Sequence, residues 1–163
     1  MVRTIAIGGF MGVGKTTAAR ALAERLHTNF VDLDEEISVN AGMSIRDIFA
    51  ESGEDGFRRL ETETLTSVLQ RPPMVLSLGG GTLHQAANRE RLESSLVVCL
   101  LMKFESVQKR IGADSASRPL WNQAASLYEY RLPLYLAQEH VLHVDELSES
   151  VVVDRLEELS RCA

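Results

Sequence analysis

Short apolar runs alternate along this chain with longer amphipathic stretches. Five of the short runs, each bounded by glycine, proline or polar residues, have the length and composition of strands. The predicted strands cover residues 4–7, 29–34, 74–78, 96–102 and 141–144. This spacing leaves room for at least one helix between successive strands.

The stretches between the predicted strands show helical periodicity. After the first strand, Ala19, Leu22, Ala23 and Leu26 recur at i, i+3, i+4 and i+7, which places them on one face of a helix. Proline residues, glycines and capping side chains mark several of the other helix ends. The other predicted helices cover residues 35–40, 44–50, 53–69, 88–93 and 104–111, a segment that starts near Gln123 and contains Pro133, and a last helix that Ser148 caps.

An alternation of strands and helices is typical of an α/β fold, in which helices cover both faces of a mostly parallel sheet. In such sheets, ligands bind at the carboxyl ends of the strands. We find no internal repeat, low-complexity tract or linker in the sequence. We therefore expect residues 1–163 to form a single domain.

Composition narrows the classes of function. The 163 residues suit one compact domain, and contents of 45% hydrophobic and 25% charged residues are typical of a soluble globular protein. The net charge of −6 argues against nucleic acid or an anionic membrane as the main partner. The apolar run 96–102 is too short to cross a bilayer, and the first apolar run ends in glycines, unlike a signal peptide. Because the two cysteines suggest no disulfide framework, we expect a cytoplasmic protein.

A glycine-rich loop follows the first predicted strand. Residues 9–16, GFMGVGKT, fit the pattern G-x-x-x-x-G-K-[ST], and the strand before and the helix after them are the setting that this pattern requires. Main-chain N–H groups of such a loop surround phosphates at the positive end of the helix dipole. Lys15 is expected to reach the β- and γ-phosphates, and the Thr16 hydroxyl to ligate Mg²⁺. The loop predicts that the protein binds a nucleoside triphosphate.

Two carboxylates follow the second predicted strand. Asp32 and Asp34 are two residues apart, so their side chains are expected to project from the same side of the strand end. One carboxylate near the phosphates can hold Mg²⁺ through water, and the other can orient a substrate hydroxyl for attack. The alternative is that Asp34 only caps the next helix.

Arginines and a triple glycine complete the candidate site. Arg58 shares a helix face with Glu61, which can hold its guanidinium for bidentate binding of a carboxylate or phosphate, although a solvated surface pair is the alternative. Residues 79–81 are three glycines at a strand end, where the backbone can approach a ligand closely. Arg118 closes a small-residue segment that suits a lid, and Arg131 can supply a second guanidinium.

Taken in order, these motifs resemble those of the shikimate kinases. The resemblance runs from Ile5 to about Leu159, and the pattern GE-x-x-FR-x-x-E, followed by GGG and R-x-P-L-Y, is specific to that family. It implies a three-layer P-loop kinase fold, with a five-stranded parallel sheet, helices on both faces and a short lid. It also implies transfer of the ATP γ-phosphate to the 3-hydroxyl of shikimate. The motifs that carry the resemblance are GFMGVGKTT, DLD, GEDGFRRLE, LGGG, SRPL and YEYRLPLY.

The resemblance also implies residue roles, with ATP and Mg²⁺ as the cofactors and shikimate as the partner of a monomeric enzyme. The residues implied for nucleotide binding are Gly12, Val13, Gly14, Lys15, Thr16, Thr17, Arg110 and Arg118, with Thr16 and Asp32 at the metal. The residues implied for shikimate binding are Asp34, Ile45, Phe49, Phe57, Arg58, Gly79, Gly80, Gly81 and Arg131. Lys15, Asp34 and Arg118 are the implied catalytic residues. The substrate-binding region spans about 34–61 and the lid about 112–121, where Trp121 replaces the smaller aliphatic residue expected of the family.

Two other functions remain open from the sequence. A related P-loop kinase for another small hydroxyl acceptor, such as gluconate, would use a similar set of arginines and acids. A nucleotide-dependent switch module would also need the glycine loop, although the N-K-x-D motif of guanine recognition is absent from the sequence.

Overall fold

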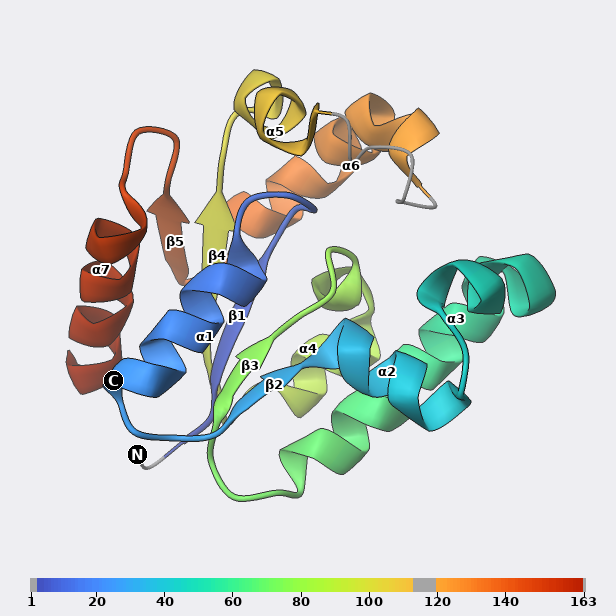
Figure 1. Ribbon diagram of the computed structural model, residues 1–163, viewed down its shortest axis with the longest axis horizontal. Helices are drawn as coiled ribbons and strands as arrows, with labels where there is room; N and C mark the ends of the chain where they lie inside the picture. The colour runs from blue at the N-terminus through green and yellow to red at the C-terminus, as the bar shows by residue number, and fades with distance from the viewer. Residues whose placement is uncertain (1–2, 113–119, 163) are drawn as a thin grey trace.

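The computed structural model describes residues 3–112 and 120–162. Within these residues, five parallel strands form one sheet in the order β2-β3-β1-β4-β5, with β1 at its centre (Figure 1). This arrangement confirms the predicted α/β class with a five-stranded parallel sheet. The strands are β1 (Ile5–Gly9), β2 (Phe30–Asp32), β3 (Val75–Ser77), β4 (Leu96–Leu101) and β5 (His140–His143).

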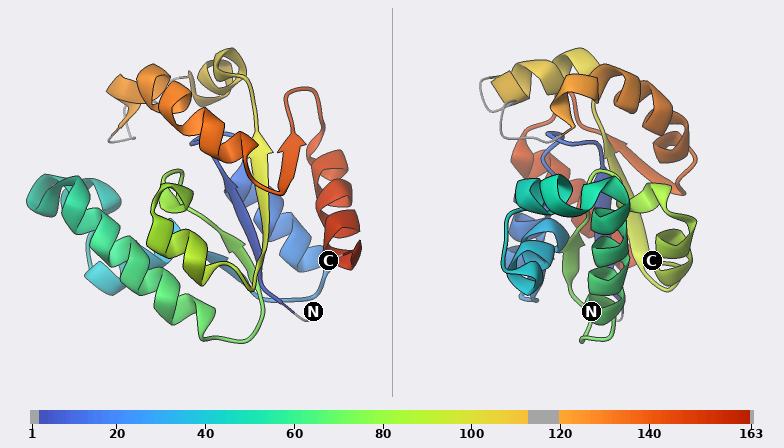
Figure 2. Two further views of the ribbon diagram at one scale, coloured as in Figure 1. Left: turned by 180° about the vertical axis from the view of Figure 1, so that it is seen from behind. Right: turned by 90° about the vertical axis from the view of Figure 1, so that its right-hand side faces the viewer.

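Helices cover both faces of the sheet, which gives the fold three layers. Helices α1 and α7 pack together on one face, while α4 and α6 lie on the other, which faces the viewer in the left panel of Figure 2. Helices α2 and α3 contact each other beside β2, at the edge of the sheet. The helices are α1 (Lys15–Arg25), α2 (Leu33–Ala41), α3 (Ile45–Leu69), α4 (Ala86–Arg91), α5 (Phe104–Ile111), α6 (Ala124–Leu136) and α7 (Glu149–Cys162).

Local sequence signals set several helix ends. Gly42 adopts a left-handed conformation with φ of 68° and ends α2, and the Ser44 hydroxyl accepts a hydrogen bond from the main chain of Asp47 to start α3. Inside α3, Gly53 has φ of 66° and ψ of −172°, which kinks the helix. This kink separates the two helical segments that were predicted at 44–50 and 53–69.

The second strand is shorter than predicted. It ends at Asp32, and Leu33 already begins α2, so Asp34 lies in the first turn of a helix and not on a strand. Asp32 is the residue that caps this helix, because its Oδ1 accepts hydrogen bonds from the main-chain N–H groups of Asp34 at 3.0 Å and Glu35 at 3.3 Å. The expected strand position of Asp34 was therefore wrong, and so was the alternative that Asp34 supplies the cap.

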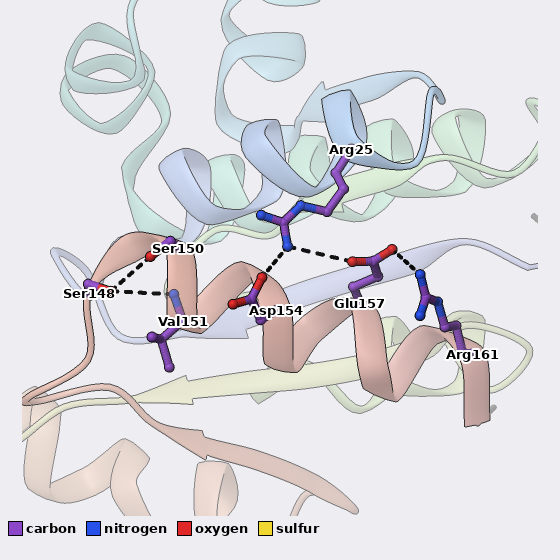
Figure 3. Close-up of polar contacts among 7 residues, drawn as sticks. All are labelled: Arg25, Ser148, Ser150, Val151, Asp154, Glu157 and Arg161. Carbon is purple, nitrogen blue, oxygen red and sulfur yellow. Dashed lines mark hydrogen bonds and ion pairs between the residues drawn. The ribbon is translucent and has the colours of Figure 1, made fainter.

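The outer face of the fold carries exposed ion pairs between its first and last helices (Figure 3). Arg25, in the last turn of α1, binds the carboxylates of Asp154 and Glu157 on α7. At the start of α7, the Ser148 hydroxyl accepts a hydrogen bond from the Val151 N–H at 3.4 Å, which confirms the predicted cap. These contacts lie on the two helices that cover one face of the sheet.

Within the part of the chain that the structure describes, two short 3-10 helices, η1 (Thr82–His84) and η3 (Trp121–Gln123), were not predicted. η1 directly follows the triple glycine, and η3 precedes α6. The hydrophobic core fills the space between the sheet and its two helical layers, and the central strands β1 and β4 supply much of it. Within residues 3–112 and 120–162, no helix has the length and apolar character that a membrane crossing requires.

Candidate active site

Two adjoining hollows open at the carboxyl ends of the strands. The first, which we call the loop hollow, is lined by the glycine loop and by the residues that follow β2 and β3. The second, the arginine hollow, lies between α3, the triple glycine and α6. Met11, Asp34 and Gly80 line both hollows. Two ligands that occupy them would therefore meet beside Asp34.

The loop hollow contains most of the residues predicted to bind phosphates. Gly12 and Gly14 have φ of 80° and 98°, and a Cβ on Gly14 would lie only 3.0 Å from Nη2 of Arg110. Both positions therefore favour glycine. Val13 buries its side chain under the loop and can offer only main-chain atoms to this hollow. The predicted residues that line the hollow are Gly12, Gly14, Lys15, Thr16, Thr17, Asp32, Asp34, Gly80 and Arg110.

Lys15 and Arg110 bring positive charge to the loop. The Lys15 ammonium is nearly buried and donates a hydrogen bond to the carbonyl of Phe10 at 2.9 Å. Arg110, in the last turn of α5, lies against Gly14, and its Nη1 donates to the carbonyl of Val13 at 3.4 Å. A phosphate in this hollow would meet both side chains together with the N-terminus of α1.

Oxygen atoms suited to a hard cation meet at one edge of the loop hollow. The Thr16 hydroxyl donates to Oδ2 of Asp32 at 2.7 Å and lies 3.3 Å from the hydroxyl of Ser77. Mg²⁺ prefers such oxygen ligands and keeps several of its waters. Thr16 and Asp32 were predicted at this place, whereas Ser77 was missed. The only sequence signal for Ser77 is that it is polar in an apolar strand.

Asp34 is a buried acid at the junction of the two hollows. Its Oδ1 is buried and has no hydrogen-bond partner among the described residues. The pKa of Asp34 is raised to about 6, first by burial and then by the nearby Asp32 carboxylate, while the charge of Lys15 opposes the shift. A carboxylate with a free oxygen of this kind can accept a hydrogen bond or a proton from a ligand hydroxyl.

Arg58 is held in the arginine hollow by two acids. Its Nη1 donates to Oε2 of Glu61 at 2.8 Å, and its Nη2 donates to Oε1 of Glu54 at 3.2 Å. The guanidinium also lies over the ring of Phe57, 5.1 Å from its centroid. The structure confirms that Glu61 positions Arg58, and it rules out the alternative of a solvated surface pair because Glu61 is fully buried. Glu61 itself lines the hollow.

Arg131 faces the same hollow from α6. It is only 4% exposed, and burial lowers its pKa, with the nearby positive charge of Arg58 acting in the same direction. On the same helix, the Tyr135 hydroxyl donates a hydrogen bond to the carbonyl of Gly80. Two guanidinium groups that share a partly desolvated hollow favour an anionic ligand between them.

Apolar side chains and glycines form the remaining walls of the arginine hollow. Ile45, Phe49 and Phe57 line it as expected, and the rings of Phe49 and Phe57 are 4.7 Å apart. Gly79, Gly80 and Gly81 also line it. A Cβ on Gly81 would lie 2.4 Å from Nη2 of Arg58, so only glycine leaves the guanidinium in its place.

Of the segment predicted to form the lid, the structure describes only the two ends. Arg118 lies outside the described residues, as does most of the segment 112–121. Leu120, which was predicted in the lid but not among the substrate-binding residues, lines the arginine hollow, and Trp121 begins η3 with its side chain half-buried.

Comparison with known proteins identifies the family. The family model described as shikimate kinase matches residues 11–160. The chain belongs to the shikimate kinase family. Among curated shikimate kinases, that of Parasynechococcus marenigrum is 38% identical over 163 residues, which cover 96% of this chain and 85% of the relative. The shikimate kinase of Thermobifida fusca is 44% identical over 132 residues, which cover 78% of this chain and 76% of the relative.

Solved structures agree with this assignment. A shikimate kinase from Acinetobacter baumannii in complex with shikimate superposes with a TM-score of 0.87 at 34% identity, and the match covers 99% of this chain and 93% of that one. A gluconokinase from Sinorhizobium meliloti superposes with a TM-score of 0.67 at 17% identity, which shows a common fold alone. These matches confirm the P-loop kinase fold. The higher sequence identity to the shikimate kinases favours that family over the gluconate kinases for this chain.

Proposed function

We propose that the protein transfers the γ-phosphate of ATP to the 3-hydroxyl of shikimate, giving shikimate 3-phosphate and ADP. The observation that carries the proposal is the position of Asp34, which lines both the loop hollow and the arginine hollow. A triphosphate in the first and a hydroxy acid in the second would place the γ-phosphate and a hydroxyl on either side of one carboxylate. Membership of the shikimate kinase family identifies the hydroxy acid.

In the loop hollow, main-chain N–H groups of residues 12–17 bind the phosphates. Lys15 neutralises charge on the β- and γ-phosphates, and Arg110 supports the loop beside the nucleotide. Arg118, on the lid, contacts the transferring phosphoryl group. Such transfer depends mostly on positioning and charge neutralisation, since the phosphoryl group itself needs little covalent help from the protein.

The metal site of this reaction is formed by Thr16 and Asp32. Their oxygens already lie within hydrogen-bond distance of each other, and the hydroxyl of Ser77 lies beside them, so the donor set fits Mg²⁺. An Mg²⁺ ion held by these residues would supply positive charge that neutralises the phosphates. Asp32 would hold the ion through water, while its other carboxylate oxygen, Oδ1, accepts a hydrogen bond from the Asp34 N–H in the first turn of α2.

In the arginine hollow, Arg58 and Arg131 bind the shikimate carboxylate, while Ile45, Phe49 and Phe57 pack against the ring. The main chain of Gly79, Gly80 and Gly81 contacts the ring hydroxyls. Asp34 orients the reacting hydroxyl. As the hydroxyl oxygen bonds to the γ-phosphorus and the bond to the bridging oxygen of ADP breaks, the hydroxyl proton passes to Asp34. Its raised proton affinity suits this step.

We propose that the enzyme is a monomer. We also infer a cytoplasmic location, because that compartment supplies ATP. Light scattering at micromolar concentration tests the first inference, and a dimer that dissociates with loss of activity would contradict it.

An assay of ADP release tests the proposed reaction. We expect turnover with ATP, Mg²⁺ and shikimate, none with gluconate, and none after chelation of the metal. Mass spectrometry of the product should show one added phosphoryl group on shikimate. Turnover with gluconate would favour the related kinase, and turnover without any acid would favour a nucleotide-dependent switch.

A further inference from the structure

Glu61 lies at a buried position, where a carboxylate is stable only if protein groups donate hydrogen bonds to it. Its side chain is fully buried, so water cannot solvate it. Its Oε2 accepts from Nη1 of Arg58 at 2.8 Å, and its Oε1 accepts from the hydroxyl of Thr82 at 2.7 Å. The two donors come from different elements, α3 and η1, and each satisfies one oxygen. Glu61 is thereby fixed from both sides.

Thr82 is itself fixed in the structure. It is fully buried, its N–H donates to the carbonyl of Gly79 at 3.2 Å, and its own carbonyl accepts from the buried side-chain amide of Asn88 at 3.2 Å. A hydrogen-bonded path therefore runs from Asn88 on α4 through Thr82 and Glu61 to Arg58. Arg58 lies in the hollow at the end of this path.

The space around the Thr82 hydroxyl shows why a donor matters there. A Cβ on Gly79 would lie 2.8 Å from Oδ1 of Asp34, 2.9 Å from Oε1 of Glu61 and 3.1 Å from Oγ1 of Thr82. Two buried carboxylate oxygens thus approach the same point, and the threonine hydroxyl is the donor beside them. Without the Thr82 hydroxyl, Oε1 of Glu61 would be buried without a hydrogen bond, and the Glu61 carboxylate would face the like charge of Asp34. Both effects favour rotation of the Glu61 carboxylate away from its present position.

We propose that Thr82 is a positioning residue for substrate binding: its hydroxyl fixes the Glu61 carboxylate, which in turn directs the Arg58 guanidinium at the substrate carboxylate. The proposal rests on the proposed shikimate kinase activity. It assigns to Thr82 no contact with substrate, so its effect is on the KM for shikimate. The KM for ATP should not depend on it, because Thr82 does not line the loop hollow.

Steady-state kinetics of Thr82→Val and Thr82→Ser test the proposal. We expect Thr82→Val to raise the KM for shikimate about tenfold, the effect of losing one hydrogen bond to a buried charge, with kcat and the KM for ATP changed less than about threefold. Thr82→Ser keeps the hydroxyl and should have the same KM for shikimate as the unaltered protein. If the methyl group of Thr82 mattered through packing instead, Thr82→Ser would raise this KM and Thr82→Val would not. If the valine variant does not fold, Thr82→Ala provides the same comparison with serine.

Coupling to Arg58 provides the second measurement. In an Arg58→Lys background, Thr82→Val should raise the KM for shikimate much less than it does alone, because the two residues act through one path. A matched control is Thr66→Val, which removes a threonine hydroxyl that donates to the carbonyl of Thr62 and accepts from Nε of Arg91, outside the arginine hollow; its KM should not change. Equal effects of Thr82→Val in both backgrounds, or an unchanged KM in Thr82→Val, would overturn the proposal. Absence of shikimate-dependent turnover in the unaltered protein would instead contradict the proposed function.

Discussion

Two arginine–carboxylate pairs in this molecule use the same chemistry in different surroundings. In the arginine hollow, the side chains of Arg58 and Glu61 are 12% and 0% exposed, whereas those of Arg25 and Asp154 on the outer face are 37% and 57% exposed. Water and salt screen the outer pair, so its contribution to stability is small. The inner pair has lost its hydration and depends on additional donors, here the Thr82 hydroxyl.

The comparison teaches what burial adds to an ion pair. A surface arginine can leave its partner at little cost and is free to reorient in water. Arg58 is fixed by Glu61 and Glu54 and supported by the ring of Phe57, so its guanidinium meets a ligand without first losing conformational freedom. The buried pair is therefore suited to binding a ligand, and the exposed pair connects two helices.

The largest effect is expected at Asp34, the buried acid whose Oδ1 has no hydrogen-bond partner among the described residues. Asp34→Asn keeps the shape of the side chain but removes the charge and the proton acceptor, so we expect kcat to fall about 100-fold or more. The matched control is Asp154→Asn, which removes a carboxylate on the outer face and should leave kcat unchanged. Steady-state ADP release measures both. Near-normal turnover of Asp34→Asn would remove this residue from the mechanism.

The second largest effect is expected when the planar guanidinium of Arg58 is replaced by an ammonium group. Arg58→Lys keeps the positive charge but cannot reproduce the planar fork, so we expect the KM for shikimate to rise about 30-fold while the KM for ATP stays nearly constant. Arg25→Lys makes the same change in the exposed pair and should alter neither constant. If both KM values rose together in Arg58→Lys, the assignment of Arg58 to the acid would be wrong.

A third expectation is a dependence on pH. Because burial raises the pKa of Asp34 to about 6, its carboxylate is lost below that pH. We expect kcat/KM for shikimate to fall about tenfold per pH unit below about pH 6 and to be level above it. A profile with no acidic limb near pH 6 would show that Asp34 is not required in its ionised form.

The free energy of unfolding should decrease as the pH rises, whereas the activity should increase. Between about pH 4 and pH 6, the folded protein holds a proton on Asp34 that the unfolded chain has released, so the free energy of unfolding decreases as the pH rises through this range. This group alone contributes a change of up to about 3 kcal/mol. Urea unfolding of Asp34→Asn should lack that component, and the variant should be more stable than the unaltered protein at pH 7.

Local patterns in the sequence predicted much of this site. The glycine loop has its strand before it and its helix after it, and both are short-range features that neighbouring residues decide. Arg58 and Glu61 are three residues apart on a helix, so their contact also follows from local geometry.

What the sequence did not predict depends on contacts between distant segments. Ser77 reaches the Thr16–Asp32 edge because β2 pairs with β3 in a register that sets Asp32 beside Ser77. Thr82 reaches Glu61 because η1 packs against α3. Asp34 was predicted on a strand because residues 31–34 alternate between apolar and polar side chains. In the structure, the cap formed by Asp32 starts the helix at Leu33, two residues before its predicted start. Neither register nor cap choice can be derived from periodicity alone.

The smallest effect is expected on the outer face. Arg25→Ala removes both contacts of this arginine with α7, those to Asp154 and Glu157 (Figure 3). Because these groups are hydrated, we expect the Tm to shift by less than about 2 °C and the kinetic constants to remain unchanged. Thermal unfolding at low and high salt measures this, and the small shift should vanish at high salt. A large loss of stability would mean that the exposed pair resembles the buried one in strength, and exposure would then not explain their different roles.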